Sequence, residues 1–182
     1  SVARLTEQKF YFYKKTPDSF RMLLTKLKEV GGIYILLGTG APEYEAYFRE
    51  VSYQYPNFVF INAQSEDLID SIYLESDLYL MPSLFEPCGI SQMLAMRNGN
   101  PCLAHATGGL KDTIEHLKTG FLFGGTSYED TLTDLERVFD QAIALFFQDP
   151  EGWENMRSRA RRKRFTWKKS VDRYYRDLYQ LS

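Results

Sequence analysis

Residues 78–104 read LYLMPSLFEPCGISQMLAMRNGNPCLA, in which two short apolar segments flank a loop and a helical pattern. The apolar segments, residues 78–81 and 102–104, have the composition of strands that are covered on both faces of a sheet. The pattern over residues 91–98 predicts a helix, and Gly99 is suited to end it. A strand, a helix and a second strand at this spacing indicate a parallel sheet with helices packed around it.

The same alternation extends over most of the chain. Further strands are predicted at residues 2–5, 33–37, 58–61 and 121–123. Helices are predicted between them, from Thr16 and Pro17 to Gly31, over residues 42–55 and over residues 66–75. The expected fold class is therefore α/β, a Rossmann-like parallel sheet with helices on both faces.

The end of the chain has a different pattern. From Tyr128 onward the apolar spacing is helical only, which predicts helices over residues 130–148, 151–163 and 167–181. We expect residues 1–182 to form a single domain, of which residues 151–182 are a C-terminal helical tail. Because the first predicted strand begins at residue 2 without a preceding methionine, the chain is expected to be a fragment of a longer protein.

Composition argues against several classes of function. The 22 basic and 24 acidic residues give a net charge of −2, so no nucleic-acid or membrane partner is expected. No apolar run reaches the ~20 residues of a membrane span. Two cysteines and two histidines are too few for a disulfide framework or a zinc cluster, and a cytoplasmic protein without a metal site is predicted. The basic run within residues 157–164 is interpreted as a solvated face or as a surface for another part of a longer protein.

Glycines and cations follow the predicted strands, at the edge of the sheet where open α/β domains bind ligands. The free backbone N–H groups at a helix start bind anions, and cations nearby add positive charge. Together they predict a site for a diphosphate. The residues concerned are Arg4 and Lys9 after the first strand, Gly38 and Gly40 after the second, Gly89 after the fourth, and Thr107, Gly108 and Gly109 after the fifth.

Glu86 makes this prediction more specific. It lies next to a predicted helix start, where its negative charge would repel a phosphate. A sugar carried on the diphosphate separates the two charges, because its hydroxyls donate to the carboxylate while the phosphates accept from the helix N–H groups. The loop therefore indicates a sugar diphosphate ligand.

These segments occur in an order that resembles the glycogen and starch synthase family. The resemblance is carried by Phe85-Glu86-Pro87-Cys88-Gly89-Ile90-Ser91-Gln92 and by Thr107-Gly108-Gly109-Leu110-Lys111-Asp112-Thr113, and it includes residues 3–9 and 36–40. Enzymes of this family are retaining glycosyltransferases with two Rossmann-like domains that face a cleft, the GT-B fold. This chain resembles their C-terminal, donor-binding domain.

The resemblance implies roles for the individual residues. Arg4 and Lys9 would hold the donor diphosphate and stabilise the leaving group, and Glu86 would bind the glucose hydroxyls. No metal or cofactor is implied, because the two cations take its place. The other implied contacts are the backbone N–H groups of Cys88 and Gly89 on the sugar, those of Ile90 and Ser91 on the phosphate nearer the nucleoside, Gly38 and Gly40 at the nucleoside, and Thr107, Gly108 and Gly109 along the cleft wall.

The implied reaction is glucose transfer from ADP-glucose or UDP-glucose to the 4-hydroxyl of an α-1,4-glucan, with retention. The helical tail would pack back on an N-terminal domain that this chain lacks, so the chain alone is expected to be inactive. The implied location is cytoplasmic, or plastidial in a plant or alga. Two alternatives stay open: another retaining GT-B enzyme with a different acceptor, and a non-catalytic nucleotide-sugar-binding module.

Two departures from the family pattern affect this interpretation. Phe10 replaces the glycine that usually follows the lysine, and the aromatic run that it begins is expected to reshape that loop. Gln64 falls about where bacterial members often carry a tyrosine stacked on adenine. The choice between ADP-glucose and UDP-glucose therefore stays open.

Overall fold

The structure, a computed structural model, describes residues 1–179 and contains two groups of parallel strands. One group pairs β1 with β2, and in the other β4 lies between β3 and β5. The strands agree with the predicted ones to within one residue at each end, and the α/β fold class is confirmed. They are β1 (Tyr34–Leu37), β2 (Phe58–Ile61), β3 (Tyr79–Met81), β4 (Cys102–His105) and β5 (Gly120–Phe123).

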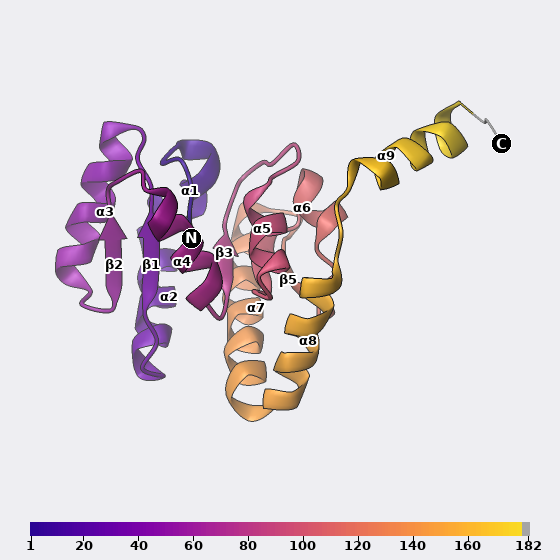
Figure 1. Cartoon of the computed structure of the whole chain (residues 1–182). Helices are drawn as coiled ribbons and strands as arrows, with labels where there is room; N and C mark the ends of the chain where they lie inside the picture. The colour runs from indigo at the N-terminus through magenta and orange to yellow at the C-terminus, as the bar shows by residue number, and fades with distance from the viewer. Residues whose placement is uncertain (180–182) are drawn as a thin grey trace.

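The first residues of the chain connect the two groups of strands (Figure 1). Val2 forms a parallel bridge with Leu37 of β1, and further along Leu5 forms one with Gly40. On the other side, the Val2 N–H donates to the Tyr79 hydroxyl of β3 at 3.0 Å. The prediction of a strand over residues 2–5 is correct in place and direction. Its ladder is reduced to two isolated bridges because a helix follows almost at once.

Helices cover both faces of the β3–β5 sheet, as the alternating side chains of β4 demonstrate. Leu103 belongs to a core cluster that contains Phe139 of α7 (Tyr128–Gln148), whereas Cys102 and Ala104 belong to a second cluster that contains Ala95 of α5 (Ser91–Arg97). Neighbouring strand residues point to opposite faces, so the sheet lies between two layers of helices. The α-helices are α1 (Glu7–Lys14), α2 (Pro17–Glu29), α3 (Pro42–Gln54), α4 (Glu66–Glu75), α5 (Ser91–Arg97), α6 (Gly108–Thr113), α7 (Tyr128–Gln148), α8 (Pro150–Arg162) and α9 (Trp167–Arg173).

Helix α1 is an element that the sequence analysis did not predict. It buries three aromatic side chains, and one backbone position inside it, Phe10, has non-helical torsion angles. The Phe10 ring meets the Phe48 ring edge-on at 5.0 Å, and the Tyr13 ring stacks on Phe20 at 4.3 Å. Burying one such ring stabilises the fold by ~2 kcal/mol. The aromatic run that was expected to reshape a loop thus fixes α1, and with it Lys9, to the core.

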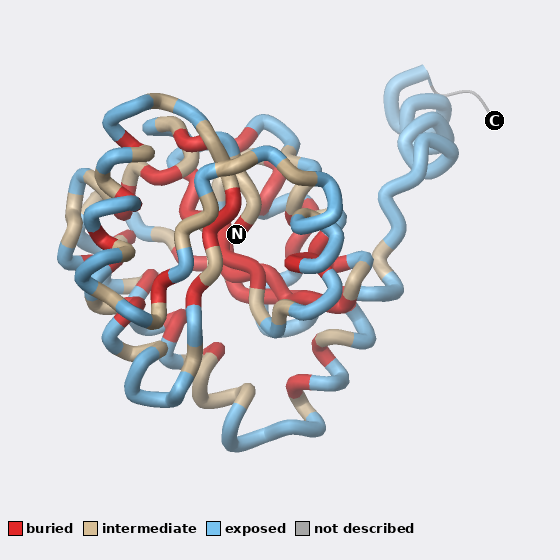
Figure 2. Tube along the Cα trace, turned by 60° about the vertical axis from the view of Figure 1, so that its left-hand side comes forward, coloured by how far each residue is buried: buried red, intermediate tan, exposed pale blue. Residues whose placement is uncertain are grey.

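The end of the described chain leaves the body of the domain (Figure 2). Within residues 167–178 no side chain is buried, and Trp167 is 86% exposed. The predicted helix over residues 167–181 is α9 followed by a short π-helix, η1 (Tyr174–Leu178), and its last two residues lie outside the described ones. None of the helices within residues 1–179 has the length and apolar character that crossing a bilayer requires.

Candidate functional site

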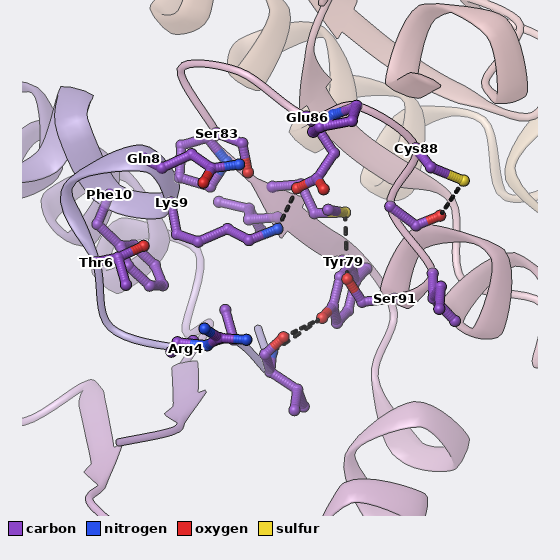
Figure 3. Close-up of a pocket in the computed structure, with 18 residues that line it drawn as sticks. Arg4, Thr6, Gln8, Lys9, Phe10, Tyr79, Ser83, Glu86, Cys88 and Ser91 are labelled. Atoms are coloured by element: carbon purple, nitrogen blue, oxygen red, sulfur yellow. Dashed lines mark hydrogen bonds and ion pairs between the residues drawn. The ribbon is translucent and has the colours of Figure 1, made fainter. Parts of the chain in front are cut away.

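A pocket of about 580 Å³ opens at the carboxyl ends of the strands, between the first residues of the chain, α1 and the loop that joins β3 to α5. Figure 3 shows Arg4 and Lys9 on one side of this pocket, with Glu86 and Cys88 on the other. Gly89, Ile90 and Ser91 complete the wall on the side of α5. The structure therefore brings the predicted cations and the predicted carboxylate to one cavity.

Lys9 and Glu86 form an ion pair across this pocket (Figure 3). The Lys9 side chain is 21% exposed and the Glu86 side chain 9% exposed, so both charges are largely withdrawn from water. An ion pair at such a depth is sensitive to the loss of either partner, because the remaining charge is left buried and uncompensated. Removing either side chain would therefore leave the other one as a buried charge without its partner.

The backbone of the Glu86 loop is held from three other elements. The Gln8 side-chain amide of α1 donates to the Phe85 carbonyl at 2.8 Å, and the Gln8 carbonyl accepts from the Leu84 N–H at 2.8 Å. From β4, the His105 Nδ1 lies 3.0 Å from the Ser83 carbonyl. The Gly109 N–H of α6 donates to the Glu86 carbonyl at 2.9 Å. These bonds fix the position from which the carboxylate enters the pocket.

The predicted Thr-Gly-Gly segment lies directly behind this loop and outside the residues that line the pocket. A Cβ atom at Gly108 would stand 2.1 Å from the Glu86 carbonyl oxygen, and one at Gly109 would stand 2.3 Å from that of Cys88. Gly108 also has a φ of +42°, which favours glycine. Thr107 is the residue that precedes α6. The two glycines let the backbone at the start of α6 approach the backbone of the Glu86 loop closely, and the segment supports that loop.

Gln92 secures the other end of the loop. Its buried side-chain amide donates to the carbonyls of Cys88 and Gly89, both at 2.9 Å, and lies 3.3 Å from the Thr113 hydroxyl. Gly89 takes a φ of +77°. The chain then turns into α5, whose first N–H groups have no partner within the helix because of the helix geometry. Gln8 and Gln92 are site residues that the sequence analysis did not identify.

A second hollow, of about 550 Å³, adjoins the first one. Gly38, Thr39 and Gln64 line it, and Arg4 lines both hollows. The Gln64 amide donates to the Thr39 hydroxyl at 3.1 Å. Gly38 allows close contact with the first strand segment, since a Cβ there would lie 1.9 Å from the Ala3 carbonyl oxygen.

Gly40 lies outside both hollows. Its N–H donates to the Glu45 carboxylate at 2.9 Å, and this bond lowers the pKa of Glu45. The structure thus brings Gly38 to the second hollow and leaves Gly40 in the turn beyond it.

His105 is the one titratable side chain among the loop supports described above. Its ring stacks on Phe123 at 5.4 Å and meets Phe12 edge-on at 5.1 Å. Burial lowers the pKa of this imidazole, and the hydrogen bond to the Ser83 carbonyl acts in the opposite direction. The neutral form is therefore favoured beneath the loop at neutral pH.

The parallel sheet with helices on both faces carries cations, glycine-led loops and a carboxylate at one strand edge, which is where open α/β domains bind their ligands. Residues 9–163 match the family model described as glycosyl transferases group 1. The chain belongs to this family.

Its similarity to glycogen synthases extends over nearly the whole chain. The glycogen synthase of Streptococcus sanguinis is 38% identical over 187 residues, which cover 98% of this chain and 37% of that protein. The glycogen synthase of Lactococcus lactis is 38% identical over 184 residues, with the same coverage of each chain. The resemblance to the glycogen and starch synthase family is confirmed, and this chain spans 37% of the length of these relatives.

Solved structures agree with this assignment. The catalytic domain of starch synthase IV from Arabidopsis thaliana, bound to ADP and acarbose, has a TM-score of 0.77 and 29% identity, covering 98% of this chain and 37% of that one. Anabaena HepE in complex with UDP has a TM-score of 0.68 at 21% identity, covering 99% and 48% of the two chains, and shows that the fold is shared. The chain therefore has the fold of one half of a GT-B glycosyltransferase.

Proposed function

We propose that this domain binds the glucose donor in a glycogen or starch synthase. The reaction transfers glucose from ADP-glucose or UDP-glucose to the 4-hydroxyl of an α-1,4-glucan, with retention of configuration. The observation that carries the proposal is the pocket in which Arg4 and Lys9 face Glu86 beside the start of α5. Two cations and one carboxylate, set on opposite sides of one cavity, suit a ligand with a diphosphate at one end and hydroxyls at the other.

The donor diphosphate is assigned to Arg4, Lys9 and the backbone N–H groups of Ile90 and Ser91. The two cations stabilise the charge that develops on the leaving nucleoside diphosphate, so they replace a metal ion in this proposal. Glu86 accepts hydrogen bonds from the glucose hydroxyls. The remaining assignments are Cys88 and Gly89 to the sugar through their N–H groups, Gly38 and Gly40 to the nucleoside side, and Thr107, Gly108 and Gly109 to the support of the sugar wall.

Retention follows from a reaction on one face of the sugar. The bond from C1 to the phosphate oxygen breaks, and the bond from C1 to the acceptor oxygen forms on the same face. The acceptor proton passes to the departing phosphate. Glu86 is assigned to sugar binding and not to nucleophilic attack, so no covalent glycosyl intermediate is part of this proposal.

A second domain is part of the proposal. The acceptor glucan binds to an N-terminal domain across the cleft. Residues 151–182 were expected to pack back on that domain, but α8 buries Trp153, Met156 and Ala160 in this one, so the chain after α8 is assigned to that contact. The 182 residues alone therefore bind the donor and do not elongate glucan. Detectable elongation by this chain would contradict this part of the proposal.

Calorimetric titration with ADP, UDP, ADP-glucose and UDP-glucose tests the proposed site. We expect the chain to bind one nucleotide pair preferentially, with unchanged affinity in EDTA, and an Arg4→Ala/Lys9→Ala variant to lose binding. The matched control is Arg137→Ala/Lys163→Ala, which removes the same two residue types at positions that line neither hollow. Equal nucleotide binding by the site variant and the control would refute the assignment of the diphosphate.

One observation keeps a second function open. Gln64 lines the second hollow, and its amide offers hydrogen bonds without the aromatic face that stacks on adenine. A uridine donor therefore stays open, and so does the alternative of another retaining GT-B enzyme, whose acceptor is a lipid or a small sugar. Incubating a longer chain that includes an N-terminal domain with glycogen and with such acceptors separates the two functions. A chain that binds donor and transfers to none of them would be a non-catalytic nucleotide-sugar-binding module.

A further inference from the structure

We infer that the Lys9–Glu86 ion pair selects a complete nucleotide sugar over a nucleoside diphosphate without its sugar. The inference rests on the proposed function, because it assigns Lys9 to the diphosphate and Glu86 to the glucose. In the state described here each of these two groups is occupied by the other (Figure 3). A ligand that enters the pocket must therefore separate them.

A nucleotide sugar replaces both halves of the ion pair. Its phosphate oxygens accept from the Lys9 ammonium, and its glucose hydroxyls donate to the Glu86 carboxylate. Neither side chain is left without a partner when the pair opens. The free energy lost when the ion pair breaks is thus offset by new hydrogen bonds at both Lys9 and Glu86.

A nucleoside diphosphate alone replaces only one half. Its phosphates attract Lys9, but nothing takes the place of Lys9 at Glu86, which keeps only 9% of its side chain exposed. The carboxylate then lies buried and unpaired next to the negative charge of the phosphates, and both effects are unfavourable. The pair therefore weakens the binding of a ligand that lacks the sugar.

The surrounding structure fixes the backbone on both sides of the ion pair. The backbone at Glu86 is tied to Gly109, and the preceding residue is tied to Gln8. Lys9 lies in α1, and the residue that follows it, Phe10, is buried in the core. The other ionisable side chains that line the pocket are Arg4, Tyr79 and Cys88, and Arg4 is the single further cation among them.

The test is calorimetric titration of the wild type and of Glu86→Gln with ADP, UDP and the two nucleotide sugars. Glutamine keeps the shape of the side chain and removes the charge that holds Lys9. We expect Glu86→Gln to bind the preferred nucleoside diphosphate about three- to tenfold more tightly than the wild type. The ratio of nucleotide-sugar affinity to nucleotide affinity should fall in the same variant.

Two further variants assign the effect to Lys9. In a Lys9→Met background, Glu86→Gln should give a clearly smaller gain, because no ammonium is released and only the repulsion between the carboxylate and the phosphates is relieved. Glu115→Gln removes an equal charge from the exposed Lys163–Glu115 pair and should leave all affinities unchanged. Thermal denaturation of each variant checks that the fold is intact.

The outcomes separate this inference from the proposed function. A wild type that binds nucleotides while Glu86→Gln binds the nucleoside diphosphate equally or less tightly overturns the inference and leaves the proposed function standing. A gain that is equally large in the Lys9→Met background, or that appears equally in Glu115→Gln, overturns it as well. If neither the wild type nor Glu86→Gln binds any of the four nucleotides, the proposed function fails and the inference fails with it.

Discussion

The position of Glu86 is determined mainly by hydrogen bonds to the backbone carbonyls of its own loop. The carbonyls of Ser83, Phe85 and Glu86 are each engaged by a different element, so that the side chain is directed by its backbone. A preorganised carboxylate loses little conformational freedom when a ligand binds. Under the proposed function, the backbone of the Glu86 loop is therefore in place before the donor binds.

His105 makes the stability of the domain dependent on pH. Burial lowers the pKa of this imidazole in the folded protein below its ordinary value of 6.5. At a pH between the lowered pKa of the folded state and 6.5, the unfolded chain therefore binds a proton at His105 that the folded chain does not bind. The free energy of unfolding is therefore highest above pH 6.5 and falls as the pH drops through that range. Urea denaturation at pH 7.5 and at pH 5.5 measures this loss.

His105→Gln is the informative variant, because its amide can still donate to the Ser83 carbonyl but does not titrate. We expect a smaller loss of stability between pH 7.5 and pH 5.5 in this variant. Part of the dependence will remain, since burial also lowers the pKa of His116, whose Nδ1 accepts from the Leu122 N–H at 2.9 Å. Identical pH profiles for the wild type and His105→Gln would contradict the prediction.

Sequence patterns predicted some site residues and could not predict others, for a physical reason. Arg4, Lys9 and Glu86 were grouped correctly because parallel strands bring the residues after their carboxyl ends to one edge. Gln8, Gln92 and His105 were not identified as supports of the loop. Their side chains donate hydrogen bonds to backbone carbonyls. Because every residue has a backbone carbonyl, the sequence does not indicate which carbonyl a side chain will bind.

At the scale of elements, the strands were predictable and α1 was not. Apolar runs between turn residues define the strands, since the sheet is buried on both faces. In α1 the aromatic residues at 10, 12 and 13 are all buried, which is not the spacing of a helix face, and Phe10 departs from helical geometry. Packing against α2 and α3, and not local preference, determines this helix.

The contact between α6 and the Glu86 loop gives a prediction for Gly109. A methyl group there would meet the Cys88 carbonyl oxygen at 2.3 Å, so Gly109→Ala forces two backbones apart. We expect a loss of stability of about 1–3 kcal/mol in urea denaturation, together with weaker binding of the nucleotide sugar.

Gly124→Ala is the matched control for this substitution. A methyl group at Gly124 would meet the Ala106 side chain at 3.5 Å, an ordinary contact, and the change in stability should stay within about 0.5 kcal/mol. If both substitutions are tolerated equally well, α6 does not support the loop as described.

At the scale of the whole molecule, α8 packs into the core of the domain and the segment that follows it does not. Within residues 167–178 no side chain is buried, whereas α8 buries Trp153, Met156 and Ala160. A chain that ends at Phe165 should therefore keep the stability of the domain to within about 0.5 kcal/mol. Urea denaturation followed by circular dichroism measures it.

A second truncation, at Asp149, provides the contrast. It removes α8 with its buried side chains, and we expect this chain to lose its cooperative unfolding transition. A loss of more than ~1 kcal/mol on removal of residues 166–182 alone would show that the tail packs on the body of the domain.

The segment at residues 2–5 has a consequence for the order of folding. It bridges two groups of strands that are far apart in sequence, with Val2 bound to Leu37 on one side and to Tyr79 on the other. Contacts of such long range form slowly, because a large loop must close before they are made. The same segment carries Arg4 and precedes Lys9, so both hollows are completed only when it docks. Under the proposed function, nucleotide binding would then report a late assembly step of the domain, and a partly folded chain would not bind the donor.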